Sequence, residues 1–399
     1  MLSLEQARTR ILDRLPRLPT ERVPLLEALD RFAAEDIRGL RAVPGFDNSA
    51  FDGYAVHSVE VASASPEHPV PLRVSGLCAA GSAPGPAFPA GSCVRIFTGA
   101  PLPAGADAIV MQEDTRSPGP GLVEVLAAST PWEGVRFAGE DVRPGDVLLR
   151  SGHRLRPGAL SLIASTGVDT LPVNRRPRLS LLSTGSELIE PGQPLQPGQI
   201  HDSNGVLLES LARREGVEVL GRTRIADELE ATLNALDQAS RSADVIITTG
   251  GVSVGDADLL RPALAKLGGE VDLWRIAMKP GKPFAFGRLG KTWWFGLPGN
   301  PVSAFVTWRV LVRPALHRLM GSVEPATVAL PARLGQPFTN RGDRRHLIRA
   351  TLDTQGRVFQ AGTQGSHLQA GLAHANVLLD LPAATTWEAG REVTVELLD

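Results

Sequence analysis

The stretch DVIITTGG, residues 244–251, is a run of apolar and small residues that ends in two glycines. A short apolar run bounded by glycine is typical of a strand that is buried on both faces, as in a parallel sheet covered by helices on both sides. Strand-like runs alternate with helical patterns around it, over residues 177–185, 204–216, 217–225, 227–242 and 257–269. This alternation predicts a doubly wound parallel α/β domain, which we place at residues 173–320.

Local signals mark the ends of the predicted helices. Asp202 and Ser203 are N-cap residue types directly before one helical pattern. Gly268 and Gly269 follow another, where glycine commonly stops a helix. Pro301 opens the long last helix of the domain, at the first turn, where proline is tolerated.

The regions outside this domain have different patterns, which together predict a multidomain α/β and β protein. We expect an N-terminal linker or helical domain at 1–53 and 141–172, with helical flanks at 1–35 and 156–167. Short apolar runs between Gly/Pro turns predict an inserted β-rich domain at 54–140. Three strand-like runs predict a small C-terminal β-barrel-like domain at 321–399.

The composition excludes several classes of protein. The net charge of -2 argues against a nucleic-acid-binding protein, because such proteins need clustered cations. Cys78 and Cys93 are the only cysteines, so neither a disulfide framework nor a four-thiolate metal site is expected. No apolar run approaches the roughly 20 residues that span a bilayer, and the N-terminal stretch has no signal-peptide core. We therefore expect a cytoplasmic protein with neither a nucleic-acid nor a membrane partner.

Three glycine-rich loops follow predicted strands of the α/β domain, at 183–187, 248–258 and 297–303. Ligands of open α/β sheets bind at the carboxyl ends of the strands, where glycines let backbone N–H groups approach an anion. For any one of these loops alone, the simple requirement of turns for glycine explains the sequence as well as, or better than, a ligand site does. Three loops at one sheet edge favour a ligand that carries phosphate.

Charged residues lie close to these loops in the sequence. Lys279 and Lys282 are three residues apart in a proline-stiffened segment, which suits binding of phosphate or oxyanion oxygens; the alternative is two solvated surface lysines. Glu187, Asp227 and Asp258 each follow a predicted strand end. Carboxylates beside an anion site are favourable when Mg²⁺ lies between them. Each carboxylate could instead serve only to place a negative charge at a helix N-terminus, where it interacts favourably with the helix dipole. For Asp227 this alternative is about as well supported as a role in the site.

Taken together, the motifs resemble those of one family, the molybdopterin molybdenumtransferases, which include bacterial MoeA and the E domain of gephyrin. The resemblance extends over essentially the whole chain. It rests on FDNSAFDGYA at 46–55, TGAPLPAGADAIVMQED at 98–114, GED at 139–141, STGSEL at 183–188, TTGGVSVGDAD at 248–258, MKPGKP at 278–283, LPGNPVS at 297–303 and QGSHLQAGLAHAN at 364–376. Phe51, Ser186 and Leu259 depart from residues common in the family, and only the missing acid at 186 bears on a cation contact.

The resemblance implies an enzyme that inserts molybdate into adenylylated molybdopterin with Mg²⁺ and releases AMP. It implies a homodimer whose active-site cleft lies between the α/β domain of one subunit and the N-terminal region of the other. The implied catalytic residues are Asp52, Thr98, Asp141, Glu187, Asp227, Asp258, Lys279 and Lys282, with Glu187 and Asp258 as the Mg²⁺ ligands. The implied substrate-binding residues are Gly250, Gly251, Ser253, Gly255, Pro298, Gly299, Asn300, Pro301, Ser303, Arg344 and Ser366.

Further partners follow from the same resemblance. A molybdopterin adenylyltransferase would supply the substrate, and acceptor molybdoenzymes would receive the finished cofactor. Two alternative functions stay open. The first is that the chain is itself an adenylyltransferase, although such enzymes are usually the size of the α/β domain alone. The second is a non-enzymatic scaffold, for which we find no added partner-binding segment.

Overall fold

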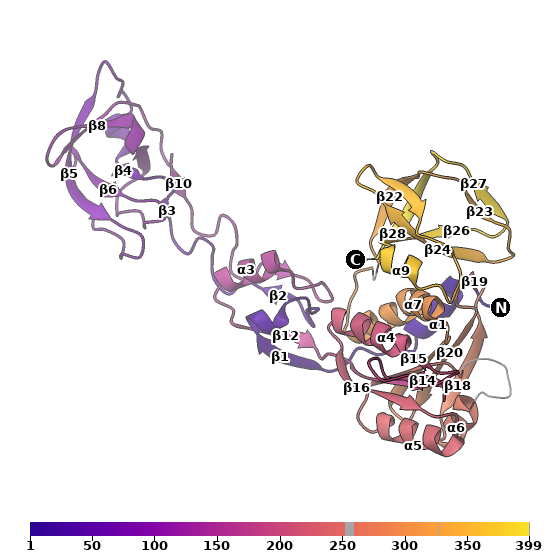
Figure 1. Cartoon of the computed structure of the whole chain (residues 1–399). Coiled ribbons are helices and arrows are strands. Elements are labelled where there is room, and N and C mark those ends of the chain that lie inside the picture. The colour runs from indigo at the N-terminus through magenta and orange to yellow at the C-terminus, as the bar shows by residue number, and fades with distance from the viewer. Residues whose placement is uncertain (252–258, 326, 399) are drawn as a thin grey trace.

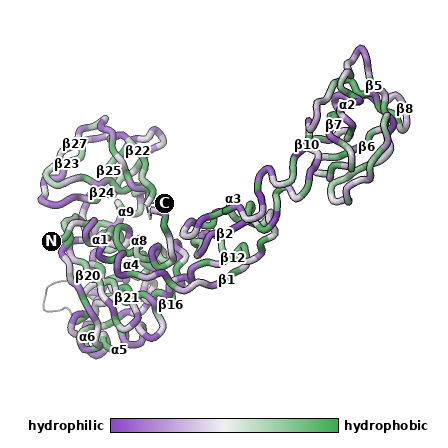
Figure 2. Tube along the Cα trace, turned by 180° about the vertical axis from the view of Figure 1, so that it is seen from behind, coloured by the Kyte–Doolittle hydropathy of each residue, from purple (hydrophilic) through white to green (hydrophobic). Residues whose placement is uncertain are grey.

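The computed structural model describes residues 1–251, 259–325 and 327–398 of the chain. The molecule is elongated, with a β-rich lobe at one end and the α/β domain together with a small barrel at the other (Figure 1). Within these residues, no helix is both long and apolar enough to cross a membrane. The opposite view in Figure 2 shows the same separation, with hydrophobic residues running through the strands of each part.

The α/β domain is built on a six-stranded sheet whose four parallel strands were expected from the sequence. These are β16 (Glu218–Ile225), β13 (Arg178–Thr184), β17 (Val245–Thr249) and β21 (Thr292–Leu297), in that order. The sheet continues with β20 (Pro283–Leu289) and β18 (Glu270–Arg275), and both of these pairings are antiparallel. The antiparallel edge was not predicted. It arises because only Gly290 and Lys291 join β20 to β21, and a two-residue loop can connect only antiparallel neighbours.

Helices cover both faces of this sheet, as the doubly wound prediction required. Successive residues of β17 enter opposite cores, Val245 and Ile247 on one face and Ile246 on the other. The first face packs against α4 (Ser203–Arg214) and the helical segment α7 (Pro301–Thr307), a π-helical turn (Trp308–Val312) and α8 (Arg313–Leu319). The second face packs against α5 (Leu229–Ser240) and α6 (Leu260–Lys266), as Figure 1 shows.

The predicted helix ends are confirmed by the hydrogen bonds. Asp202 is the N-cap of α4, and its carboxylate accepts from the Gly205 backbone N–H at 2.8 Å. Gly268 has a φ of 73°, and its N–H and that of Gly269 donate to Ala265 O and Leu264 O after α6 ends. Pro301 occupies the first turn of α7.

The N-terminal residues are divided between two parts of the molecule. Helix α1 (Leu4–Leu12), closed by a capping box between Ser3 and Gln6, buries Leu4, Ala7 and Ile11 in the core of the α/β domain. The expected helical flank does not extend to residue 35. Pro16 and Pro19 remove backbone donors, and β1 (Thr20–Pro24) then pairs with β12 (Thr170–Asn174), followed by a 3-10 turn (Leu25–Ala28).

A small linker domain forms around this β1–β12 pair. It also contains the short pair β2 (Ile37–Arg38) and β11 (Val147–Leu149), and α3 (Pro157–Ser165). Its core includes Val23, Ile163 and Leu171. In Figure 1 this domain joins the distal lobe to the α/β domain.

The distal lobe is the inserted β-rich domain that the sequence predicted. Its sheet has the order β7-β4-β6-β5-β9-β8, and a two-stranded ribbon of β3 and β10 lies beside it. The strands are β3 (Asn48–Ser49), β4 (Gly53–Val56), β5 (Val70–Cys78), β6 (Ser92–Ile96), β7 (Ala108–Met111), β8 (Thr115–Gly119), β9 (Leu122–Val125) and β10 (Val135–Arg136), with a short helix α2 (Ser58–Val61).

The C-terminal part is a small closed barrel, which confirms the predicted β fold. Its strands β24, β25, β22, β28 and β26 pair in that order, and β26 pairs back with β24. A short strand of the preceding domain, β19 (Met278–Lys279), pairs with the first two residues of β24, Arg345 and His346. The elements are β22 (Ala329–Leu334), β23 (Phe338–Asn340), β24 (Arg345–Leu352), β25 (Arg357–Gln360), α9 (Ala370–His374), β26 (Val377–Leu381), β27 (Thr385–Trp387) and β28 (Glu392–Leu397).

Candidate functional site

The three glycine-rich loops meet at one edge of the α/β sheet. The register pairs Ser183 with Thr249 and Thr249 with Leu297, so the three strands end side by side. The Thr184 hydroxyl donates to Thr249 O at 3.0 Å, and the Gly250 N–H donates to Leu297 O at 3.1 Å. The predicted convergence of the loops is therefore present in the fold.

Glycine is required at this meeting point by backbone geometry. Gly250 and Gly251 have φ values of 84° and 61°, in the left-handed region that other residues rarely adopt. A Cβ at Gly250 would lie 2.7 Å from Thr184 Oγ1, and one at Gly299 would lie 3.6 Å from the Gly250 Cα. The loops thus approach closely enough to form one continuous backbone surface. Ser253, Gly255 and Asp258, which the sequence assigned to the same site, lie outside the described residues.

Two carboxylates lie on the β13 and β16 side of this edge. Asp227 Oδ2 accepts from the Ser186 N–H at 3.1 Å, and the Asp227 N–H donates to Ser186 Oγ at 3.1 Å. Ser186 therefore fixes the Asp227 loop. The exposed Glu187 carboxylate lies over Gly185, where a Cβ would be 2.6 Å from Glu187 Oε2. No hydrogen bond or ion pair within the described residues engages that carboxylate, so it is available to a ligand.

The basic residues lie where the α/β domain meets the barrel. Lys279 is in β19 and pairs with His346 of β24, and Lys282 follows it in an exposed position. A Cβ at Gly281 would lie 2.8 Å from Thr307 Cγ2, so the loop of residues 279–282, which we call the lysine loop, packs against α7. Burial, with the charges of Lys279 and Arg349, lowers the pKa of His346 to about 4. His346 is therefore neutral near pH 7, and the positive charge here belongs to lysine and arginine.

Arg344 joins this basic group from the barrel. Its Nη1 donates to Met278 O at 3.2 Å, and its Nε lies 3.5 Å from the carboxylate of Asp343. The main-chain bond holds the guanidinium beside the lysine loop. The structure thus brings together residues that are about 60 positions apart in the sequence, as the bond from Arg344 to Met278 illustrates.

The start of α7 is closed by a segment of the barrel. Asn300 is the N-cap, and Ser366 Oγ accepts from Asn300 Nδ2 at 3.2 Å, while Ser366 O accepts from the Val302 N–H at 3.1 Å. Ser303 is buried, with 5% of its surface exposed. Ser366 therefore lies next to the loop at Pro298, Gly299 and Pro301 and accepts a hydrogen bond from one of the first N–H groups of the helix.

Asn204 is a residue of this site that the sequence analysis missed. Its Nδ2 donates to Gly299 O at 2.7 Å and so links α4 to the third glycine loop. Gln369 of the barrel similarly donates to Ser203 Oγ at 3.1 Å. Neither residue belongs to a glycine-rich motif, and only the position of Asn204 in the first turn of α4 could have indicated it.

The remaining candidates lie in or near the distal lobe. Asp52 Oδ1 accepts from both the N–H and the hydroxyl of Thr98, at 2.7 and 2.8 Å. These two bonds, the backbone one first, lower the pKa of Asp52, so the carboxylate is charged at neutral pH. Asp141 is exposed, and its N–H donates to Val43 O at 3.1 Å. Within one chain, the distal lobe that carries Asp52 and Thr98 is far from the α/β domain (Figures 1 and 2).

Exposed aromatic residues lie on the chain segments next to the Asp52–Thr98 pair. The Ala50 N–H donates to Gly134 O and the Gly99 N–H to Ser49 O, so three segments of the lobe meet here. The rings of Trp132 and Phe137 lie 5.6 Å apart. The exposed aromatic residues of these segments, which we call the aromatic face, are Phe46, Phe51, Phe97, Trp132 and Phe137.

The donor set at the strand ends suits Mg²⁺ better than a softer metal. Glu187 and Asp227 offer carboxylate oxygens, which are hard ligands, and no thiol or imidazole lies among the residues of this edge described above. Among the described residues, no group of three or more His, Cys, Asp or Glu could hold a metal by itself. Mg²⁺ is commonly bound by one or two carboxylates together with phosphate oxygens of the substrate, so these residues fit such an ion.

The fold and the site define a multidomain α/β protein in which glycine loops, lysines and carboxylates lie at one edge of the sheet. Comparison with known families gives three matches along the chain: the MoeA N-terminal region (domain I and II) at 2–167, a probable molybdopterin binding domain at 180–318 and the MoeA C-terminal region (domain IV) at 331–398.

Similar proteins and structures cover the full chain. A molybdopterin molybdenumtransferase from Haemophilus influenzae is 39% identical, over 99% of this chain and 98% of that protein. One from Bacillus subtilis is 35% identical, over 95% of this chain and 90% of that protein. The crystal structure of a molybdopterin biosynthesis moeA protein from Pyrococcus horikoshii OT3 matches with a TM-score of 0.85 at 28% identity, covering 100% of both chains. The chain belongs to the MoeA family.

Proposed function

We infer that the chain is a molybdopterin molybdenumtransferase, which inserts molybdate into adenylylated molybdopterin with release of AMP. The observation that carries this inference is the 39% identity to a relative of that name over 99% of the chain. The convergence of the glycine loops with Lys279, Lys282 and Arg344 supports it, because both substrates are anions. An enzyme of this kind works in molybdenum cofactor biosynthesis, and we place it in the cytoplasm.

The proposed catalysis depends on placement and electrostatics and needs no covalent enzyme intermediate. Backbone N–H groups of Gly251 and Gly299 would hold the phosphate groups of the pterin substrate. Gly250, whose own N–H is bonded to Leu297 O, would let the substrate approach the backbone closely. Lys279, Lys282 and Arg344 would neutralise molybdate and phosphate charge. Asn300, Pro301 and Ser303 would shape the pocket, with Ser366 holding the start of α7 in place. Pro298, Ser253 and Gly255 complete the proposed substrate contacts.

We propose that Glu187 and Asp258 would hold Mg²⁺, with Asp227 beside them. When bound, the ion would withdraw charge from the phosphoanhydride oxygens as AMP leaves. The free Glu187 carboxylate supports its role as a ligand. Asp227 has one oxygen committed to the Ser186 N–H and would act mainly by orienting the loop.

We further propose a homodimer in which the site is shared between subunits. The distal lobe, in which Asp52 precedes β4 and Thr98 follows β6, is far from the α/β domain within one chain, so these two residues can act at the α/β edge only if a partner supplies them (Figure 1). We place Asp141, on the segment between β10 and β11, in the same shared site. The aromatic face beside Asp52 would pack against the partner's α/β domain. We expect a molybdopterin adenylyltransferase upstream and acceptor molybdoenzymes downstream, and no nucleic-acid or membrane partner.

The test combines purified protein with adenylylated molybdopterin, molybdate and Mg²⁺, and follows AMP release and active cofactor. We expect AMP only when molybdate and Mg²⁺ are both present, and a large loss of rate in the Lys279→Gln variant. Consumption of ATP and free molybdopterin, with the adenylate left untouched, would instead identify an adenylyltransferase. A protein that binds the adenylate without turnover would be a scaffold.

A further inference from the structure

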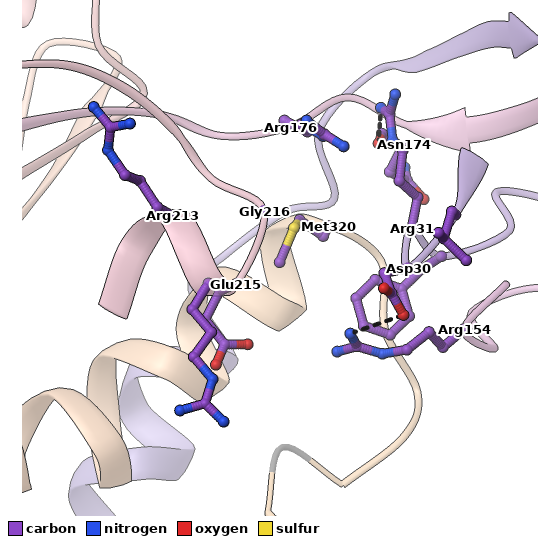
Figure 3. Close-up of a pocket in the computed structure, with 12 residues that line it drawn as sticks. Asp30, Arg31, Arg154, Asn174, Arg176, Arg213, Glu215, Gly216 and Met320 are labelled. Atoms are coloured by element: carbon purple, nitrogen blue, oxygen red, sulfur yellow. Dashed lines mark hydrogen bonds and ion pairs between the residues drawn. The ribbon is translucent and has the colours of Figure 1, made fainter. Parts of the chain in front are cut away.

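A second cationic cavity lies away from the proposed active site, between the linker domain and the α/β domain. Its volume is about 340 Å³, and five arginines and two carboxylates line it. Figure 3 shows Asp30, Arg31 and Arg154 of the linker domain facing Glu215 and Gly216 at the end of α4. Arg176, on the segment that connects the two domains, lies between these walls.

Only one of the two carboxylates of the cavity is neutralised by a group outside it. Glu215 forms an ion pair with Arg313 at 2.5 Å and a hydrogen bond with His317 at 2.7 Å, both from α8 behind the cavity wall. Asp30 is 3.9 Å from Arg154, at the limit of an ion pair. Asp30 therefore offsets part of the charge of Arg154, and neither carboxylate pairs with Arg31 or Arg176.

Two arginines of the cavity, Arg176 and Arg31, keep unused hydrogen-bonding capacity, whereas Arg213 pairs with Glu209. Arg176 makes no side-chain hydrogen bond or ion pair within the described part of the chain. Arg31 donates through Nη2 to Glu21 and, at 2.8 Å, to Asn174 O, but its Nε is buried without a partner. Only 9% of the Arg31 side chain is exposed, so this donor lacks the water that would otherwise satisfy it.

The end of α4 does not oppose an anion strongly, although a helix C-terminus carries partial negative charge. The carbonyls of Leu211, Ala212 and Arg213 accept from the N–H groups of Glu215, Val217 and Gly216, at 3.2, 3.0 and 3.0 Å. These bonds satisfy the last carbonyls of the helix. The electrostatic potential inside the cavity is therefore determined mainly by the arginines.

We propose that this cavity binds a phosphate dianion, either as free phosphate or as the phosphate of a nucleotide. Guanidinium groups match phosphate oxygens with paired donors, and a dianion would engage Arg176, which has no side-chain partner among the described residues, and the unpartnered Nε of Arg31. Because Arg31 and Arg154 belong to the linker domain and Arg176 to the connection, the bound anion ties the linker domain to the α/β domain. The site is independent of the proposed catalytic edge.

Isothermal titration calorimetry with inorganic phosphate, in buffer of constant ionic strength, tests the proposal on the full-length protein. We expect saturable binding that weakens about tenfold or more in Arg176→Gln, because one charge-assisted contact is lost. Arg176 has no side-chain partner to lose, so this variant should keep the melting temperature of the wild type. Arg154→Gln provides a second variant, and Arg73→Gln, an exposed arginine of the distal lobe, is the matched control.

A second arm separates the two sources of phosphate. AMP is titrated into the Lys279→Gln protein, in which binding at the proposed catalytic site is weakened. AMP binding that is lost on adding Arg176→Gln, without binding of free phosphate, assigns the cavity to a nucleotide. If neither phosphate nor AMP binds, or if Arg176→Gln and Arg73→Gln bind them alike, the proposal is wrong.

Discussion

At the scale of single residues, the candidate site depends on two features. Some side chains have no hydrogen-bond or ion-pair partner within the described residues, and some glycines have a backbone conformation that leaves no room for a side chain. Glu187 has no partner among the described residues, whereas Asp52 is held by Thr98. Gly250 and Gly251 take left-handed backbone conformations in contact with Thr184 and Leu260. The glycines give a prediction about the stability of the protein, and the Glu187 carboxylate gives a prediction about cation binding.

The first prediction concerns Gly250. In Gly250→Ala the new Cβ would meet Thr184 Oγ1 and the Thr184 carbonyl at 2.7 and 3.0 Å, at a φ of 84°. We expect a loss of about 2–4 kcal/mol in the free energy of unfolding, from backbone strain and crowding together. Gly192→Ala is the control, since Gly192 has a φ of 92° with nothing within 4 Å and should lose only about 1 kcal/mol. Equal losses in urea unfolding would show that the close approach is unimportant.

The second prediction concerns the cation. Glu187→Gln keeps the shape of the side chain but removes its charge, so the Mg²⁺ concentration for half-maximal AMP release should rise about tenfold, or roughly 1.4 kcal/mol. Glu230→Gln, at an exposed position in the first turn of α5, should leave it unchanged. Removal of Mg²⁺ by a chelator should abolish AMP release in both proteins. An unchanged Mg²⁺ requirement in Glu187→Gln would remove this residue from the cation site.

At the scale of elements, helix ends are tied together by buried charges. Glu215, the C-cap of α4, contacts Arg313 and His317 of α8, and Phe32 of the linker domain packs 5.4 Å from the His317 ring. Asp244 similarly joins β17 to the linker segment through Arg175, with two bonds of 2.8 Å. Such pairs set the position of the linker domain on the α/β domain, and removing one partner is costly.

The third prediction follows from Glu215. Burial alone would raise the pKa of Glu215, but the His317 bond and the Arg313 charge lower it from 4.5 to about 2. Because the folded pKa is lower, the stabilisation is complete above about pH 4.5 and is lost as the pH falls toward 2. Burial lowers the pKa of His317 below 6.5, so its contribution is also lost on acidification. The melting temperature should therefore fall progressively from pH 6.5 downward.

Thermal unfolding of two variants checks the assignment. Glu215→Gln leaves Arg313 and His317 without their carboxylate and should cost about 3–5 kcal/mol at pH 7. Glu209→Gln, whose carboxylate pairs with Arg213 and Arg222 closer to the surface, should cost about 1 kcal/mol or less. The decrease in melting temperature between pH 4.5 and 3 should be smaller in Glu215→Gln than in the wild type. A parallel pH profile in both would contradict the role of Glu215.

At the scale of the whole molecule, the elongated shape separates two groups of proposed site residues. The α/β edge carries Glu187, Lys279 and Lys282, and the distal lobe carries Asp52 and Thr98 (Figure 2). A compact arrangement of one chain would need the linker domain to fold back. A second copy can bring the two groups together without any such change.

The fourth prediction tests this sharing. Asp52→Asn and Lys279→Gln subunits, coexpressed with different affinity tags and purified as mixed dimers, should have one intact site of two and about half of the wild-type rate of AMP release. Dimers of Lys279→Gln with Lys282→Gln are the control, because both of their α/β edges are damaged and neither site is restored. Absence of mixed dimers, or equal activity in the two combinations, would exclude a shared site.

Much of the fold followed from local patterns in the sequence. The strand 244–251 was predicted because a buried strand between two helical layers needs apolar residues on both faces, and β17 has them. The caps at Asp202, Gly268 and Pro301 were predictable because capping depends on a few neighbouring residues. The β20–β21 hairpin and the end of the N-terminal helix at Leu12 were missed. Apolar runs alone do not reveal strand direction, and Pro16 and Pro19 prevent the N-terminal helix from continuing toward residue 35.

For the candidate site, the sequence by itself determined which residue types are present and that three glycine loops follow three strands. Parallel strands place their carboxyl ends at one edge, so this part of the site follows from local pattern and sheet geometry. Only the tertiary structure decided that Arg344 and Ser366 of the barrel close the site, that Asn204 joins it, and that Asp52 lies far away in the same chain. These contacts join residues that are widely separated in sequence. The local hydrophobic pattern of a chain predicts helices and strands, but it does not predict how domains pack against each other.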